Sequence, residues 1–350
     1  MRLLITGGAG FVGSSLAIWF RKHRKCEVIC LDNLKRRGSE LTLPRLKQHG
    51  ISFIHGDVRN REDTMALPSA DLMFECSAEP SVLAGYGGSS PAYLIDTNLT
   101  GAINCFEWAR CHKAGVIFIS TSRVYPFDRL KEATFSAAAT RLELNGSSWP
   151  GISDEGVSEE FTLAGIRSLY GATKLSAELM LAEYGAAYDI PFVINRCGVL
   201  AGPWQFGKTD QGVFTHWLLS HHLGRPLSYI GYGGDGKQVR DLLHVEDLAE
   251  LLAKQIEQSG LNGKTWNVGG GRTVSLSLQE TTALCREITG REVPITSVLE
   301  ERPADIPWYV TDARKVRAAF GWEPQRNPRR LLQETYAWIK ENEQQLIEAL

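Results

Sequence analysis

Short apolar runs alternate with longer amphipathic stretches along the first half of the chain. Such alternation predicts β-strands separated by helices, and hence a parallel, doubly wound sheet. The apolar runs are unbroken, as expected for strands that are buried on both faces of a sheet. The predicted strands are residues 3–6, 27–31, 51–55, 72–76 and 115–120, and a helix is predicted from about 98 to 112.

The pattern changes in the second half. Residues 126–166 form a less regular stretch rich in small and acidic residues, which is typical of a lid or a binding insertion. A helix over 170–184 and a strand over 190–196 then continue the earlier pattern, and later segments are shorter.

We therefore expect an α/β protein with two units. Residues 1–197 form a Rossmann-type domain with a doubly wound parallel sheet and the insertion at about 126–166. Residues 198–350 form a smaller C-terminal substrate-binding lobe, interleaved with the last elements of the sheet.

Composition narrows the class of protein. The 350 residues are 43% hydrophobic and 22% charged, with a formal net charge of −2. These values are those of an ordinary soluble globular protein, and they predict neither a nucleic-acid partner nor an anionic membrane partner. No apolar run approaches the ~18 residues of a membrane-spanning helix. The seven cysteines are scattered and no metal-ligand spacing occurs, so we expect free thiols, no metal site and a cytoplasmic location.

A glycine-rich segment directly follows the first predicted strand. Residues 7–13 read Gly-Gly-Ala-Gly-Phe-Val-Gly, and a helical stretch follows. Glycine lets the backbone approach a pyrophosphate without a Cβ clash, and the helix N-terminus offers N–H groups and a partial positive charge. The segment therefore predicts a dinucleotide site. Its residues are Gly7, Gly10, Phe11, Val12 and Gly13.

Acidic residues follow two of the predicted strands. Asp32 lies 19 residues after Gly13, close to the ~20 expected for the carboxylate that binds a ribose. A carboxylate there repels a 2′-phosphate, which favours NAD over NADP, although the basic residues 35–37 come next. Asp57 and Val58 follow the third strand, where an adenine ring would be flanked. Each acidic residue can alternatively be an ordinary turn or cap residue.

Tyr170 and Lys174 are four residues apart on a predicted helix, which places both side chains on one face. A nearby ammonium favours the phenolate form, so Tyr170 can act as a base toward a sugar hydroxyl while Lys174 holds the nicotinamide ribose. Thr121, at the carboxyl end of the fifth strand, can hydrogen-bond the same substrate oxygen. A Tyr-x-x-x-Lys spacing alone is common on solvated helices, but its place after the glycine segment and Thr121 favours a catalytic site.

These motifs follow one another as they do in the extended short-chain dehydrogenases/reductases. The chain closely resembles that superfamily over nearly its whole length, and within it the nucleotide-sugar epimerases. Asn98 and the segments 236–247, 267–270 and 302–305 match further landmarks of these enzymes. The resemblance implies NAD as the cofactor. The cofactor residues that it adds are Asn33, Asp57, Val58, Ser77, Ala78, Asn98 and Ser120, together with Tyr170 and Lys174.

The resemblance also implies a nucleotide-sugar substrate. Its substrate residues are Arg196, Gln211, Arg240 and Arg302. Arg240 and Arg302 would hold the pyrophosphate, for which a guanidinium fork is suited. Either arginine can alternatively be a surface ion-pair partner.

The residues after Thr121 indicate the reaction. Dehydratases of this superfamily carry Asp-Glu directly after the catalytic Thr, whereas this chain has Ser122 and Arg123. The acid–base pair that would remove water is missing, so we expect an epimerase. An epimerase oxidises a sugar carbon to a ketone and returns the hydride to the other face of that carbon. The segments 32–38 and 205–212 and the long insertion resemble the CDP-paratose 2-epimerases, which implies inversion at C2 of a CDP-hexose.

Several positions depart from the family pattern. Residues 75–79 read Glu-Cys-Ser-Ala-Glu instead of a His-Leu-Ala-Gly-Gln type of run, Leu169 replaces a proline, and Pro126 replaces a glycine. The sugar and the base therefore stay open, and a UDP-hexose 4-epimerase is an alternative. A net dehydrogenase and a dinucleotide-binding regulator without turnover are further alternatives.

The superfamily's dimers imply a homodimer here. Two helices of each subunit form a four-helix bundle in those dimers, and the matching helices are 98–112 and 170–186. An apolar stripe on these helices would form the seam, or would belong to the core of one subunit. Its residues are Ile103, Phe106, Leu175, Leu179 and Leu181.

Overall fold

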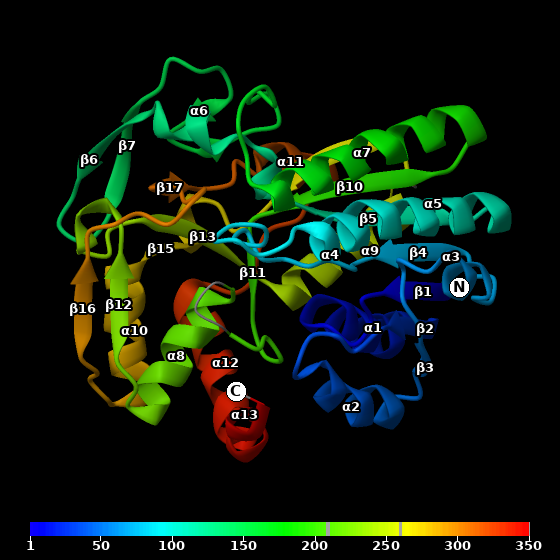
Figure 1. The fold of residues 1–350 in the computed structure, drawn as a ribbon, viewed down its shortest axis with the longest axis horizontal. Helices are drawn as coiled ribbons and strands as arrows, with labels where there is room; N and C mark the ends of the chain where they lie inside the picture. Colours follow the sequence, from blue (N-terminus) through cyan, green and yellow to red (C-terminus); the bar gives the residue numbers. More distant parts are fainter. Residues whose placement is uncertain (208–210, 259–260, 350) are drawn as a thin grey trace.

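A seven-stranded parallel β-sheet lies at the centre of the protein (Figure 1). The computed structural model describes residues 1–207, 211–258 and 261–349. The strand order is β3-β2-β1-β4-β5-β10-β14, and every neighbouring pair is parallel, which confirms the doubly wound α/β fold. The strands are β1 (Arg2–Thr6), β2 (Glu27–Asp32), β3 (Ser52–His55), β4 (Leu72–Glu75), β5 (Gly115–Thr121), β10 (Phe192–Cys197) and β14 (Lys264–Val268).

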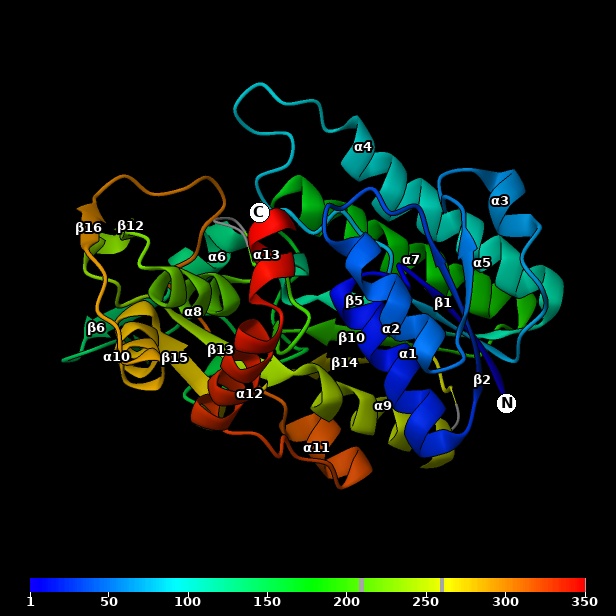
Figure 2. The same cartoon turned by 90° about the horizontal axis from the view of Figure 1, so that it is seen from below.

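Helices cover both faces of the sheet (Figure 2). Because the strands are apolar on both faces, they contribute to two cores, with Ile5 in one and Leu4 in the other. On the Ile5 face lie α1 (Phe11–Arg24), α2 (Leu43–Gln48), α9 (Val245–Gln258) and α11 (Arg314–Phe320). On the Leu4 face lie α3 (Arg61–Met65), α5 (Gly101–His112) and α7 (Leu169–Tyr188).

The strand order reverses between β1 and β4. β1 pairs with β2 on one side and with β4 on the other. The connection after β1 therefore runs toward one side of the sheet, and the connection after β4 runs toward the other. This reversal opens a crevice at the carboxyl ends of the strands. Asp32, Glu75 and Thr121 are the last residues of β2, β4 and β5, so all three lie at this edge of the sheet.

The C-terminal lobe and the sheet exchange segments. The chain leaves β10 for the lobe, returns to the sheet through α9 and β14, and then enters the lobe again. The lobe has its own apolar core. Its strands are β11 (Val199–Ala201), β12 (Leu227–Ile230), β13 (Val239–His244), β15 (Ser275–Ser277), β16 (Ile295–Val298) and β17 (Trp308–Tyr309), and its helices are α8 (Val213–Leu223), α10 (Leu278–Thr289), α12 (Pro328–Glu341) and α13 (Glu343–Ala349).

The insertion is more regular than its sequence indicated. It contains α6 (Phe127–Lys131) and two hairpins, β6 (Thr134–Ala137) with β7 (Leu142–Gly146), and β8 (Ile152–Ser153) with β9 (Gly156–Val157). Val157 and Phe161 pack in a core with Tyr309 of the C-terminal lobe. Arg141 also donates to the Glu280 carboxylate at 2.6 Å. These contacts with distant segments order residues whose own composition is typical of a loop.

The helix before β5 begins earlier than expected. α4 (Ala92–Ile95) starts directly after Pro91, and a π-helical turn over Asp96–Thr100 joins it to α5. The prediction of a start near residue 98 was therefore wrong. A π turn breaks the 3.6-residue spacing on which such predictions depend, and it holds Asn98.

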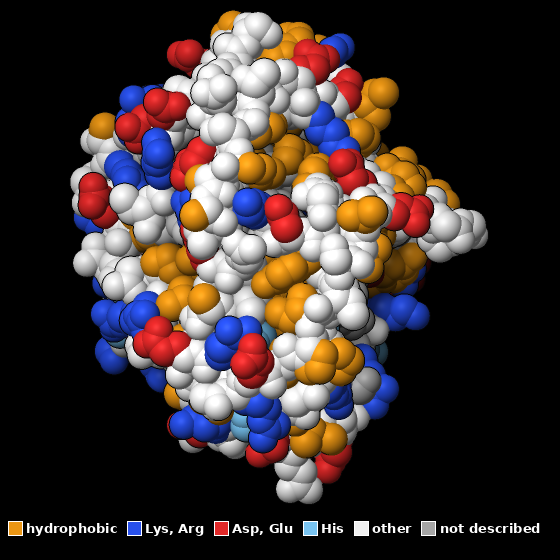
Figure 3. All heavy atoms as spheres, turned by 90° about the vertical axis from the view of Figure 1, so that its left-hand side faces the viewer, with side chains coloured by type: hydrophobic (Ala, Val, Ile, Leu, Met, Phe, Trp, Pro, Cys, Tyr) orange, Lys and Arg blue, Asp and Glu red, His pale blue; other side chains and the backbone are white. Residues whose placement is uncertain are grey.

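The surface carries charges of both signs. In the view of Figure 3, Lys and Arg side chains intermix with Asp and Glu side chains, as the net charge of −2 suggests. Among the helices of the described residues, none has both the length and the apolar character of a membrane span.

Candidate active site

The segment 7–13 turns from β1 into α1 beside a cavity of about 390 Å³, which we call the glycine-loop cavity. A Cβ on Gly13 would stand 2.2 Å from the Gly7 carbonyl oxygen, so glycine is needed where α1 begins this close to the loop. No side chain caps α1 at Gly10, so its first N–H groups are available to a ligand. The predicted cofactor residues on the cavity lining are Gly7, Gly10, Asp32, Asn33, Val58, Ser77 and Ala78. Phe11 and Val12 form the first turn of α1 and are not on that lining.

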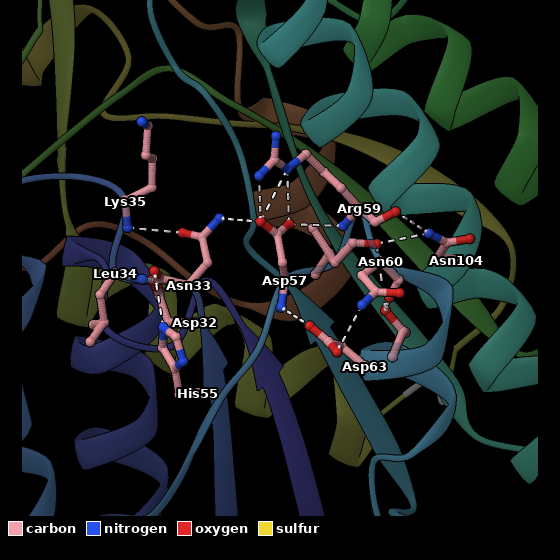
Figure 4. Close-up of polar contacts among 12 residues, drawn as sticks. Asp32, Asn33, Leu34, Lys35, His55, Asp57, Arg59, Asn60, Asp63 and Asn104 are labelled. Atoms are coloured by element: carbon pink, nitrogen blue, oxygen red, sulfur yellow. Dashed lines mark hydrogen bonds and ion pairs between the residues drawn. The ribbon is translucent and has the colours of Figure 1, made fainter.

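Asp32 combines a structural contact with a place on the cavity (Figure 4). Its carboxylate accepts hydrogen bonds from the N–H groups of Ala9 (3.0 Å) and Leu34 (2.8 Å). Burial raises the pKa of Asp32, and these hydrogen bonds oppose the shift. Glycine backbone, an uncapped helix N-terminus and a strand-end carboxylate are the groups that bind a dinucleotide, so the residues present fit NAD.

Asp57 accepts hydrogen bonds from neighbouring side chains and does not line the glycine-loop cavity. Its carboxylate accepts hydrogen bonds from Asn33 Nδ2 (2.9 Å) and Arg59 Nη2 (2.6 Å), as Figure 4 shows. Burial acts to raise the pKa of Asp57, but these hydrogen bonds outweigh it and lower the pKa to about 2. Asp57 therefore orients Asn33, which does line the cavity.

Asn98 holds the loop after β4 in place. Its Oδ1 accepts a hydrogen bond from the Glu79 N–H (2.8 Å), and its Nδ2 donates to the Glu79 carbonyl (3.1 Å) and to Thr173 Oγ1 (3.4 Å). Ser77 and Ala78 of that loop line the glycine-loop cavity, whereas Asn98 does not. Asn98 thus acts on the cavity through the loop, and it ties the loop to α7.

Thr121 and Tyr170 meet, as their order along the chain predicted. Burial raises the pKa of Tyr170 to about 12, whereas a hydrogen bond with Thr121 and the positive charge of Arg123 act to lower it. The carboxylate of Glu75 acts in the same direction as burial. Tyr170 is therefore a neutral phenol at neutral pH in the unliganded protein.

The side chain of Lys174 is buried in the interior of the protein. Its Nζ lies 3.5 Å from Glu75 Oε2 and 3.9 Å from the centroid of the Phe118 ring. Glu75 was not predicted as a site residue. The departure of residues 75–79 from the family pattern was a signal for Glu75 in the sequence. Only the packing of β4 beside β5 and α7 shows that Glu75 contacts Lys174.

A second cavity, of about 400 Å³, lies between the sheet edge and the C-terminal lobe. Gln211, Arg240 and Arg302 line it, as expected for substrate residues, and we call it the arginine cavity. Arg240 is held by Asp305 at 2.9 Å. The lining also has apolar side chains, among them Trp217, Leu227, Ile230, Leu276 and Leu278.

Arg123 also lines the arginine cavity, and sequence reasoning missed it as a site residue. A Cβ on Gly171 would stand 2.0 Å from the Arg123 carbonyl oxygen, so the chain after β5 touches the first turn of α7 at this glycine. The Arg123 side chain donates to the Ala304 carbonyl at 3.3 Å. Within the part of the chain that the structure describes, no carboxylate pairs with it. Its position two residues after Thr121 was the available signal.

Arg196 is the predicted substrate residue that the structure corrects. It is absent from the lining of the arginine cavity and is buried, because its guanidinium pairs with the Glu178 carboxylate (2.7 Å) and donates to Tyr125 Oη (3.2 Å). Ser120 Oγ donates to the same carboxylate and does not line the glycine-loop cavity. Both side chains are buried near the ends of β5 and β10, where they share the Glu178 carboxylate.

Gln211 lines both cavities, so the two adjoin. Its side chain contacts Arg36 and donates to Glu79 Oε1 (3.3 Å). Thr121, Tyr170 and Lys174 lie on neither lining, but each has a neighbour on one: Arg123 on the arginine cavity and Cys76, next to Glu75, on the glycine-loop cavity. Residues 208–210 of the predicted 205–212 loop lie outside the described residues.

The fold and these two cavities define a Rossmann-type, dinucleotide-dependent enzyme. The model of the NAD dependent epimerase/dehydratase family matches residues 3–269. The chain belongs to this family, and its cofactor is NAD. NAD-dependent chemistry on a nucleotide sugar, as the sequence suggested, is thereby supported at the level of the family.

Named relatives match nearly the whole chain. It is similar to CDP-paratose 2-epimerase of Salmonella typhi, with 29% identity over 97% of this chain and 99% of that protein. It is similar to dTDP-glucose 4,6-dehydratase of Neisseria gonorrhoeae, with 27% identity over 97% of this chain and 96% of that protein. Among solved structures, UDP-glucose 4-epimerase of Thermus thermophilus in complex with NAD is 25% identical, with a TM-score of 0.75 and coverage of 97% of this chain and 99% of that chain.

Proposed function

We propose that the protein is an NAD-dependent nucleotide-sugar epimerase that inverts C2 of a CDP-hexose. The observation that carries the proposal is the hydrogen bond between Thr121 and Tyr170, next to Arg123 on the lining of the arginine cavity, which adjoins the glycine-loop cavity at Gln211. A cofactor in the first cavity and a nucleotide sugar in the second would then reach one proton-transferring pair.

The mixed lining of the arginine cavity supports one way of holding the substrate. Apolar side chains such as Trp217 and Leu227 suit a nucleobase, and Arg240 and Arg302 suit the pyrophosphate. The sugar would then lie near Arg123, next to Thr121 and Tyr170.

The proposed chemistry needs one proton acceptor at the reacting carbon. A bound NAD would supply the hydride chemistry, as the acceptor of a hydride from that carbon and the donor that returns it to the opposite face of the ketone. Tyr170 is a neutral phenol in the unliganded protein, and the positive nicotinamide ring of the bound cofactor would favour its phenolate. As the phenolate, Tyr170 Oη would take the hydroxyl proton as the ketone forms and give it back as the ketone is reduced. Thr121 Oγ1 would hydrogen-bond the same oxygen, and the Lys174 ammonium would hold the cofactor's ribose. Proton transfer of this kind contributes ~10²–10⁴ in rate.

The relatives differ in reaction, and specific residues favour epimerisation. Ser122 and Arg123 stand where the dehydratases carry an acid pair, so no side chain is placed there to expel water. The similarity to CDP-paratose 2-epimerase supports CDP and C2. The similarity to UDP-glucose 4-epimerase supports the alternative, a UDP-hexose 4-epimerase that uses the same residues.

A homodimer in the cytoplasm belongs to the same proposal. Phe106, Leu175 and Leu181 of the expected seam are buried within the subunit. Leu179, on α7, is 62% exposed, and Tyr188 at the end of that helix is 54% exposed. These two apolar side chains support a partner on α7, because large apolar groups are costly to leave in water.

Incubation with CDP-paratose, CDP-glucose and UDP-glucose, followed by NMR of the products, tests the assignment. We expect a product inverted at C2 from a CDP sugar and none from Tyr170→Phe. A product only from UDP-glucose, inverted at C4, would replace the C2 assignment by the alternative. Accumulation of one NADH for each sugar consumed would replace both by a dehydrogenase.

A further inference from the structure

Glu75 and Lys174 form an ion pair in the interior of the protein. Lys174 Nζ lies 3.5 Å from Glu75 Oε2, and Lys174 and Glu75 are 1% and 0% exposed. The second carboxylate oxygen, Oε1, accepts a hydrogen bond from the Ser77 N–H at 3.0 Å. The ammonium is thus held between a carboxylate on β4 and the ring of Phe118 on β5.

A buried ammonium needs a counter-charge. Desolvation favours the neutral amine, and an adjacent carboxylate offsets this cost. The groups near the pair supply no other anion among the described residues, because burial raises the pKa of each neighbouring thiol and keeps it protonated. These thiols are Cys76, Cys105 and Cys197. Burial raises the pKa of Glu75 as well, and the Lys174 ammonium and the Ser77 N–H act to lower it, so the pair stays charged only through these contacts. The other titratable groups that act on Tyr170 are Arg123 and Glu75.

We propose that Glu75 is a positioning residue, which keeps the Lys174 ammonium charged and fixed where the proposed function requires it. The inference rests on the catalytic assignment of Lys174 under that function. Glu75 itself touches neither substrate nor cofactor in this role; it acts through Lys174. The carboxylate also anchors Ser77, whose loop lines the glycine-loop cavity, so one side chain sets both the lysine and the loop.

The test measures Lys174 directly in the unliganded protein. With ¹³C-lysine labelling, the Lys174 Cε resonance, assigned by its loss in Lys174→Met, is followed from pH 6 to 11. In Glu75→Gln we expect its titration midpoint to fall by about one pH unit or more, because the buried ammonium has lost its partner. Glu75→Asp keeps the charge and should restore most of the wild-type midpoint. If Glu75→Gln does not fold, Glu75→His removes the negative charge in the same test.

A matched control distinguishes the effect of Glu75 on Lys174 from the general effect of removing a buried carboxylate. Asp247 is fully buried and pairs with Arg326 at 2.6 Å, in a contact remote from Lys174. Asp247→Asn should lower the unfolding temperature and leave the Lys174 midpoint unchanged.

The pH dependence of turnover gives a second measurement of the effect of Glu75 on Lys174. The alkaline limb of the pH profile should move to lower pH in Glu75→Gln by the amount found by NMR. An unchanged Lys174 midpoint in the folded variant would overturn the inference. Because the NMR titration needs no substrate, it stands even if no nucleotide sugar is turned over, in which case only the proposed function fails.

Discussion

The guanidinium of Arg196 holds the carboxylate of Glu178 inside the protein, with hydrogen bonds of 3.0 Å from Nε and 2.7 Å from Nη2. Arg196 lies near the carboxyl end of β10, and Glu178 lies one helical turn after Lys174 on α7. Ser120 donates to the same carboxylate from β5. The pair therefore locks the helix that carries Tyr170 and Lys174 against the strand that carries Thr121.

Removing Arg196 should destabilise the fold rather than weaken substrate binding. Arg196→Met leaves the buried Glu178 carboxylate without its counter-charge, with only the Ser120 hydroxyl as a described hydrogen-bond donor, which costs ~3–5 kcal/mol. Urea unfolding should show this loss, while calorimetry should show nearly unchanged affinity for a nucleoside diphosphate in the folded variant. Arg302→Gln, on the arginine cavity, should do the reverse. Weaker binding by a fully stable Arg196→Met would restore Arg196 to the substrate site.

Tyr170→Phe and Thr121→Val should fold normally and lose turnover. Tyr170 transfers the proton in the proposed reaction, so kcat should fall by ~10²–10⁴, and Thr121→Val should cost less because it removes only a hydrogen bond. Product formation by NMR measures both effects. Ser176→Ala, which removes a half-buried hydroxyl that donates to the Ala172 carbonyl of the same helix, is the control. Undiminished turnover by Tyr170→Phe would dismiss the catalytic assignment.

Arg123→Gln should distinguish the sugar end of the arginine cavity from its pyrophosphate portion. Burial lowers the pKa of Arg123 to about 10, and Arg240 adds to this effect, yet the side chain stays charged at neutral pH. A hydrogen bond from a charged group is worth ~1.5–3 kcal/mol, so the affinity for the nucleotide sugar should fall about tenfold or more. The affinity for the nucleoside diphosphate alone should change little. An equal loss for both ligands would place Arg123 on the pyrophosphate instead.

Leu179→Lys should weaken the proposed dimer. The side chain is exposed on α7, where the partner is expected, and a buried ammonium at the seam would be costly. Sedimentation velocity over a range of concentrations measures the equilibrium. Leu299→Lys changes a side chain that is 74% exposed in the C-terminal lobe and should leave the equilibrium unchanged. A monomeric wild-type protein would end the dimer proposal.

Asp241 should make stability fall as pH rises. Burial raises its pKa to about 6, although hydrogen bonds from Thr311 and Gly271 oppose the shift. The unfolded chain titrates near ~4, so the folded state binds the proton more tightly; the contribution to stability is complete below that pH and is lost as pH rises through about 6. Between pH 4 and 7 the stability of wild type relative to Asp241→Asn should fall by on the order of 3 kcal/mol. Urea unfolding at each pH provides the measurement, and a constant difference would contradict the assigned shift.

Local patterns were enough for much of the fold and part of the site. Apolar runs placed the strands of the first half within one or two residues, because strand burial depends on neighbouring residues in the chain. The glycine segment, Asp32 and the Tyr170–Lys174 spacing were read in the same way. The π turn at Asn98 and the hairpins of the insertion were missed, because no local spacing encodes them.

By itself the sequence determined the parallel sheet, the dinucleotide loop and the residues able to move a proton, since each follows from the chemistry and spacing of nearby residues. Only the tertiary structure decided which charges meet. Glu75 reaches Lys174, Arg196 turns to Glu178 and Arg123 enters the arginine cavity because strand order and side-chain packing join segments that are remote along the chain. In a buried site those long-range pairings set where a charge is stable, and no local pattern specifies them.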